Sequence, residues 1–128
     1  NMRIEHLAIW ADNIELLRNF YMKYFDMQSN EMYTNEKKGF HSYFLSWKGE
    51  NSRIEIMSQA GKIESLPNKM KGLAHFAIAL GSEERVLQLT EQLREDGYKV
   101  FSEPRYTGDG YFESVIGDPE GNYVELTV

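Results

Sequence analysis

The sequence contains no cysteine and only three prolines in 128 residues. Without cysteine the chain cannot carry a disulfide framework, and this suits a protein of the reducing cytoplasm, where we expect it to act. No apolar run approaches the roughly 20 residues that a membrane-spanning helix needs, and no signal peptide is evident. We therefore expect no membrane partner.

Positive charge is also scarce, with 14 lysines and arginines against 20 aspartates and glutamates, a net charge of −6. The basic residues form no cluster larger than Lys37-Lys38 or Lys69-Met70-Lys71, which argues against nucleic-acid binding. The hydrophobic content of 41%, with 13% aromatic residues, is ordinary for a globular protein. We expect residues 2–128 to form a single domain with a real core.

The C-terminal segment combines a turn with a strand. Asp118-Pro119-Glu120-Gly121 is typical of a turn, with Pro where φ near −65° is favoured and Gly where φ can be positive. After it, Val124 and Leu126 alternate with polar residues, so Glu125 is predicted to lie mid-strand between two apolar neighbours. The same pattern occurs at Ile54-Glu55-Ile56.

The order of predicted elements is strand, helix and three strands, twice over. In the first half we expect a strand over 3–10, a helix from Asp12-Asn13 to about residue 25, and strands over 28–35, 40–48 and 52–58, the last two joined by a turn at Lys48-Gly49-Glu50-Asn51. After a polar connector over 60–71, we expect a strand over 73–80, a helix from the cap Ser82 to Gly97, and strands over 98–104, 111–116 and 122–128.

Histidine and glutamate recur at matching places in the two halves. His6 and His75 are 69 positions apart, and Glu55 and Glu125 are 70 apart. A repeat of a whole supersecondary unit is more informative than any single motif. A lone strand histidine is usually a packing or surface residue. His41, which has no counterpart in the second half, is interpreted as structural or as lining the rim of the site, not as a ligand.

If the first and last strands of each half lie close together, the histidine and the glutamate of that half converge on one concave face. Two such halves facing each other would bring two imidazoles and two carboxylates together. This donor set suits one divalent transition ion, zinc, nickel, cobalt, manganese or iron, better than magnesium or calcium. Four protein ligands on a six-coordinate ion leave two positions for water or substrate. We therefore predict a metal site made of His6, Glu55, His75 and Glu125.

The repeated halves, the four predicted ligands and the Gly117-to-Asn122 turn together resemble the vicinal-oxygen-chelate superfamily, with glyoxalase I (lactoylglutathione lyase) and its bacterial relatives as the nearest pattern. The resemblance covers essentially the whole chain. It implies an α+β fold of two tandem βαβββ modules, 2–59 and 72–128 joined by the linker 60–71, which form an eight-stranded half-barrel cup. It also implies a homodimer, with the cup built within one chain or across two subunits.

The resemblance further implies a glyoxalase-like lyase or isomerase acting on a small α-oxo substrate, such as the hemithioacetal that methylglyoxal forms with a thiol. The metal would bind two adjacent substrate oxygens and stabilise an enediolate. Glu125 matches the proton-transferring base of the family, and Glu55 matches its partner.

The chain departs from glyoxalase I at two positions that serve glutathione. Trp10 stands where the family has arginine, and Gln59 stands where it has asparagine. These departures argue against glutathione as the thiol. Trp10 is interpreted equally as a wall of the substrate pocket or as part of a subunit interface. Three further residues are predicted at the substrate mouth: Arg105, as an anion contact, Tyr106 and Tyr111.

Other functions occur in the same superfamily. Thiol transfer to an epoxide, epoxide hydrolysis and ring-cleaving oxygenation typically use two histidines and one glutamate, with the second histidine at the position of Glu55; epimerases usually have glutamine there. A non-catalytic drug-binding protein of the bleomycin-resistance kind generally lacks the ligand set. The glutamate at position 55 therefore favours the glyoxalase-type function over these alternatives.

Overall fold

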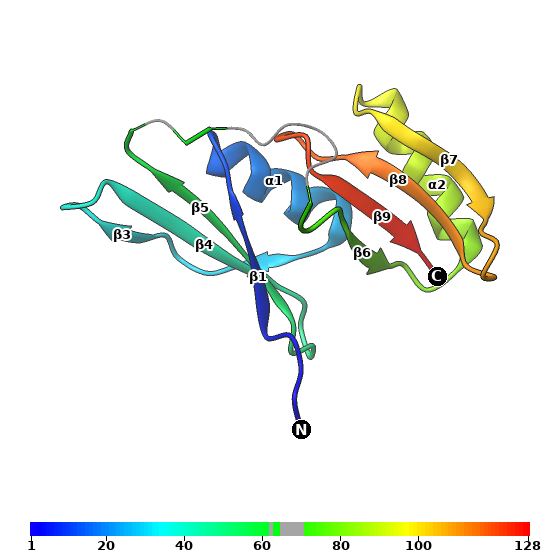
Figure 1. The fold of residues 1–128 in the computed structure, drawn as a ribbon, viewed down its shortest axis with the longest axis horizontal. Coiled ribbons are helices and arrows are strands. Elements are labelled where there is room, and N and C mark those ends of the chain that lie inside the picture. Colours follow the sequence, from blue (N-terminus) through cyan, green and yellow to red (C-terminus); the bar gives the residue numbers. More distant parts are fainter. Residues whose placement is uncertain (62, 65–70) are drawn as a thin grey trace. The chain divides into compact units, whose positions relative to one another are not determined.

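The computed structural model describes residues 1–61, 63, 64 and 71–128 of the chain, which divides into two compact units, Asn1–Ser65 and Leu66–Val128 (Figure 1). Each unit begins with a strand, continues with a helix and ends with further strands, as predicted; the second unit has the predicted three strands after its helix, and the first has four. Most of the connector predicted over 60–71 lies outside the described residues.

The first unit is a mixed sheet with one helix. Its elements are β1 (His6–Trp10), α1 (Ile14–Phe25), β2 (Gln28–Ser29), β3 (Tyr33–Asn35), β4 (Phe40–Ser46) and β5 (Arg53–Gln59). The strands lie in the order β1-β5-β4-β2, and β3 also pairs with β4. The first and last strands are parallel neighbours, as the prediction of a shared His–Glu face requires.

The single strand predicted over 28–35 is wrong, because the chain leaves the ladder between β2 and β3. Asn30 interrupts it: its backbone N–H donates to the carbonyl of Phe44 at 3.1 Å, and its side-chain Oδ1 accepts the N–H of the same Phe44 at 2.8 Å. A side chain thus replaces the backbone acceptor that would have continued the strand. The turn before β5 also closes one residue earlier than predicted, with Glu50 N–H bonded to the carbonyl of Trp47.

Helix α1 is capped by Asn13, one residue later than Asp12, the first acceptor of the predicted start. The Asn13 side chain accepts the N–H of Leu16 at 3.0 Å, which satisfies one of the free donors of the first turn. Its apolar stripe is buried against β4 and β5 and consists of Ile14, Leu17, Phe20, Tyr21 and Phe25. The helix ends at Asp26, whose positive φ of 55° is the left-handed conformation common at helix C-termini.

The second unit repeats this architecture. Its elements are β6 (Phe76–Ala79), α2 (Glu83–Glu95), β7 (Val100–Tyr106), β8 (Phe112–Gly117) and β9 (Tyr123–Thr127), with strand order β6-β9-β8-β7. The strand predicted over 73–80 is shorter than expected, so His75 stands immediately before β6. The pairing of β7 with β8 shifts register between Ser102 and Arg105, where Pro104 has no N–H to donate.

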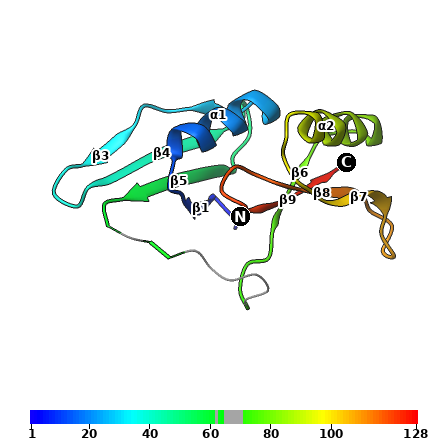
Figure 2. The same ribbon diagram turned by 90° about the horizontal axis from the view of Figure 1, so that it is seen from above.

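Each helix covers one face of its own sheet and leaves the other face, here called the open face, uncovered (Figure 2). The apolar residues of β5 and β9, Ile54 and Ile56 in one and Val124 and Leu126 in the other, are buried beneath the helix. The alternation of strand side chains then places the glutamate between each pair on the open face. Neither helix within the described residues is long and apolar enough to cross a membrane.

The turn that leads into β9 is held by one buried carboxylate. Asp118 Oδ1 accepts the N–H groups of Glu120 and Asn122 at 2.9 and 3.0 Å, and both of its carboxylate oxygens contact the Asn122 side-chain amide. Gly121 adopts φ of +85°, as the predicted turn requires. This geometry defines where β9 begins and therefore on which face Glu125 lies.

A buried pair of hydroxyls ties α2 to β8. Thr90 Oγ1 donates to the Val86 carbonyl at 2.6 Å and lies 2.8 Å from Ser114 Oγ, and both side chains are fully or almost fully buried. Because a buried hydroxyl without a partner is costly, the two residues depend on each other.

We expect Thr90→Val to destabilise the protein by about 1–3 kcal/mol, because it leaves the Ser114 hydroxyl buried and unpaired. Adding Ser114→Ala removes that unpaired group, so the double variant should lose less stability than the sum of the two single variants. Urea denaturation of the four proteins measures this; strictly additive losses would show that the hydroxyls are not coupled.

Candidate metal centre

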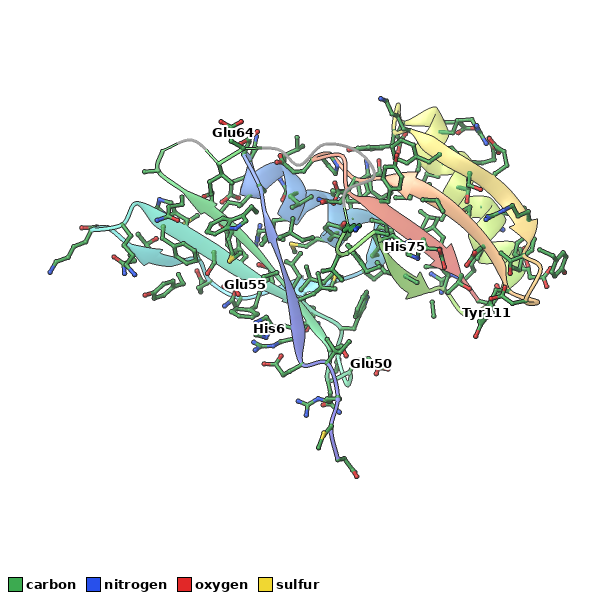
Figure 3. The ribbon with its side chains drawn as sticks, viewed as in Figure 1. His6, Glu50, Glu55, Glu64, His75 and Tyr111 are labelled. Atoms are coloured by element: carbon green, nitrogen blue, oxygen red, sulfur yellow. The ribbon has the colours of Figure 1, made fainter. Side chains whose placement is uncertain are left out.

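The open face of the first unit brings together His6 from β1 and Glu55 from β5. The parallel register pairs Ala8 with Glu55, which leaves room beside the glutamate for the imidazole two residues earlier. His6 Nε2 lies 3.8 Å from Glu55 Oε1, with side chains 40% and 17% exposed (Figure 3). The prediction that these two residues share a face is confirmed.

The second unit reproduces the arrangement with His75 and Glu125. Here Ala77 pairs with Glu125, the equivalent of the Ala8–Glu55 pairing, and His75 Nε2 lies 2.9 Å from Glu125 Oε2. The side chains are 44% and 15% exposed, close to the values of the first pair. The internal repeat seen in the sequence therefore extends to the side-chain geometry.

The chemistry of each pair fits a first-row transition metal. Nitrogen and oxygen ligands about 2.1 Å from an ion and next to each other in its coordination shell are about 3 Å apart. The 2.9 Å separation of the second pair matches that distance, and the 3.8 Å of the first is slightly longer. Within the described part of the chain, no group of three or more His, Cys, Asp or Glu is arranged to hold a metal, so joint binding by the two pairs stays a prediction.

An ion pair that the sequence did not reveal lies beside His6. Glu5 and Arg53 form two hydrogen bonds, Nε to Oε2 at 2.8 Å and Nη2 to Oε1 at 2.5 Å. The Arg53 guanidinium, with a smaller contribution from the His6 ring 3.5 Å away through Nδ1, lowers the pKa of Glu5 to about 2. The guanidinium also stacks over Phe44, 4.0 Å from the ring centroid. The only sequence signal was a glutamate adjacent to the predicted ligand.

Beside Glu125 lies a second carboxyl that the sequence analysis missed, Glu113 on β8. A hydrogen bond with Glu125 raises the pKa of Glu113, burial and repulsion from the same carboxylate raise it further, and Arg105 lowers it. Arg105 Nη2 is 3.9 Å from the Glu113 carboxylate. Because β8 and β9 are joined by the Asp118 turn, alternation from Glu125 across the hairpin could have placed Glu113 on the same face.

The open face of the first unit also carries Trp10 and Gln59. Trp10 lies four residues after His6 on β1, so its side chain is on the same face of the sheet. It is 45% exposed, and its ring stands edge-on to that of Phe40 with 6.2 Å between the ring centroids. Gln59 ends β5, pairs with Phe40 across the ladder and is exposed. Both residues predicted near the substrate therefore lie on the sheet face that carries Glu55.

The three residues predicted at the substrate mouth in the second unit divide between two faces. Arg105 pairs with Glu113 across the ladder and lies on the Glu125 side. The next residue, Tyr106, points the other way and donates to the Glu83 carboxylate on α2 at 2.6 Å. Tyr111 is 60% exposed in the β7–β8 loop (Figure 3), which closes through Thr107 N–H to the Tyr111 carbonyl at 2.7 Å.

Comparison with known proteins shows which family the chain belongs to. The chain is 26% identical to the uncharacterized protein YqjT of Bacillus subtilis (strain 168) over 128 residues, 96% of each protein. Its fold matches a glyoxalase family protein from Enterococcus faecalis, with a TM-score of 0.80, 23% identity and coverage of 98% of this chain and 97% of that one.

Two glyoxalase I structures are also similar. Glyoxalase I from Zea mays, a V278E mutant, matches with a TM-score of 0.80 and 23% identity over 98% of this chain, which spans only 44% of the maize protein. Glyoxalase I from Leishmania major matches with a TM-score of 0.79 and 18% identity, covering 99% of this chain and 86% of that one. The sequence profile of one superfamily matches residues 3–126. The two βαβββ units thus belong to a member of the Glyoxalase/Bleomycin resistance protein/Dioxygenase superfamily, and the predicted fold class is confirmed.

Proposed function

We propose that this protein is a metal-dependent lyase or isomerase of the glyoxalase type, acting on a small α-oxo or hemithioacetal-type substrate. The observation that supports this most directly is the His–Glu pair on the open face of both units, in the same strand register. The proposed ligands of one divalent transition ion, zinc, nickel, cobalt, manganese or iron, are His6, Glu55, His75 and Glu125.

The ion, when bound, would polarise the substrate oxygens and make the neighbouring carbon–hydrogen bond more acidic. Glu125 is the proposed base that takes this proton and returns it to the adjacent carbon, and Glu55 is its counterpart in the first unit. Their side chains are only 15% and 17% exposed, so each carboxylate is partly sheltered from water while its oxygen stays on the open face. Partial shelter favours proton transfer to a bound substrate over exchange with solvent.

The residues around the two pairs suggest a thiol other than glutathione. Trp10 and Gln59 offer an aromatic surface and an amide where glyoxalase I has arginine and asparagine. Neither side chain is a cation that could bind a glutathione carboxylate. Arg105, 47% exposed, is the proposed anion contact of the second unit. The Leishmania major relative is itself described as trypanothione-dependent, an example of this fold serving a different thiol.

The proposal includes a cytoplasmic homodimer, in which the site is completed within one chain or across two. The resemblance to glyoxalase-type proteins of this length supports the dimer. The cysteine-free composition suits a reducing compartment.

We expect the protein, reconstituted with zinc or nickel, to bind about one ion for each set of four ligands. His75→Ala should weaken binding by at least about 100-fold, because even changes outside the ligand set typically cost about 10- to 100-fold. Calorimetric titration measures the affinity. His41→Ala is the matched control, since His41 on β4 is paired with Thr34 on β3 and is not part of either His–Glu pair. Equal affinities for all three proteins would exclude the proposed site.

Glu125→Gln should reduce turnover by about 10²- to 10⁴-fold, the usual contribution of a positioned base, with substrate binding largely retained. The assay uses methylglyoxal with glutathione and with alternative thiols, at saturating metal. Metal content measured in the same samples separates loss of the base from loss of the ion. Glu91→Gln, an exposed glutamate on α2, is the control. Normal turnover in Glu125→Gln would rule out its assignment as the base.

A further inference from the structure

The ion pair between Glu5 and Arg53 is held by several contacts, unlike an ordinary surface pair: Glu5 immediately precedes β1, Arg53 begins β5, and Phe44 of β4 packs against the guanidinium. Arg53 opens β5 and donates its backbone N–H to the Glu5 carbonyl at 2.9 Å, while its guanidinium holds both Glu5 carboxylate oxygens. The guanidinium rests on the ring of Phe44 from β4. The Glu5 carboxylate is therefore fixed in position on the open face beside His6, although its side chain is 42% exposed.

One oxygen of this carboxylate contacts both neighbours. Glu5 Oε1 is 2.5 Å from Arg53 Nη2 and 3.5 Å from His6 Nδ1, and the imidazole stands edge-on to Phe44 at 5.4 Å between ring centroids. The other ring nitrogen, Nε2, faces Glu55. His6 therefore lies between two carboxylates. The Glu5 carboxylate is paired with Arg53, and the Glu55 carboxylate is directed at the proposed metal position.

A neutral imidazole carries its proton on only one nitrogen, and the partner of that nitrogen decides which one it is. Histidine ligands commonly donate the proton of the nitrogen that does not bind the metal to a carboxylate, which sets both the tautomer and the ring orientation. An acceptor at Nδ1 leaves the Nε2 lone pair free. Without it, Nε2 could carry the proton and donate it to Glu55.

We propose that Glu5 is a positioning residue for His6: it accepts the Nδ1 proton and holds Nε2 unprotonated toward the metal position. This inference rests on the proposed function. It makes the two halves unequal, since the residue before His75 is Ala74, which has no acceptor side chain. The first unit uses an added carboxylate to orient its histidine, and the second has no equivalent at that position.

The test compares Glu5→Ala and Glu5→Gln with the wild type by two measurements. Nitrogen-15 NMR of the histidine rings in the metal-free protein at alkaline pH reports the His6 tautomer. Competition with a chromophoric chelator reports zinc affinity. Glu5→Ala should shift His6 toward the Nε2–H tautomer and weaken zinc binding about 10- to 100-fold. Glu5→Gln keeps an oxygen that can accept from Nδ1, so its tautomer population and its zinc affinity should both lie between those of the wild type and of Glu5→Ala.

The control is Glu103→Ala, which removes the Glu103–Arg94 ion pair that joins β7 to α2 on the covered side of the other sheet. This variant should change neither the His6 tautomer nor the zinc affinity. An unchanged tautomer in Glu5→Ala overturns the positioning role, even if zinc affinity falls, because the loss would then come from charge alone. Unchanged zinc affinity overturns it as well. A wild-type protein that binds no zinc overturns the proposed function instead, and with it any role of Glu5 toward a metal.

Discussion

The parallel pairing of the first and last strands of each unit is the constraint on which the candidate site depends. Residues 49 or 50 positions apart in the sequence become neighbours only because β1 lies beside β5 and β6 beside β9. Parallel strands need a long crossover connection, and the helix with the intervening strands supplies it. The crossover also buries the apolar side of each sheet, so the pairing and the core are formed together.

The register of that pairing matters as much as its existence. A shift of one residue would turn Glu55 under α1 and bring Ile54 or Ile56 to the open face, because strand side chains alternate. Burial of the two isoleucines, 4% and 0% exposed, opposes such a shift. In the second unit the Asp118 turn adds a further restraint at the start of β9. Core packing and turn chemistry thus position the carboxylates without contacting them.

The surroundings of the two glutamates differ even though the pairs are equivalent. In the first unit the added charge lies next to the histidine, where Glu5 is neutralised by Arg53. In the second unit it lies next to the glutamate, where Glu113 shares a hydrogen bond with Glu125 and is partly offset by Arg105. The repeat of one framework therefore carries two His–Glu pairs with chemically different surroundings.

The sequence by itself determined the βαβββ order, the Ser82 cap, the turn at Asp118 and the faces on which Glu55 and Glu125 lie, because these follow from local periodicity and backbone preference. Only the tertiary structure decided that Asn30 would break the predicted strand, that Glu5 would reach both Arg53 and His6, and that Glu113 would contact Glu125. Those contacts join strands distant in the chain. They depend on register and side-chain conformation, which no local pattern of residues specifies.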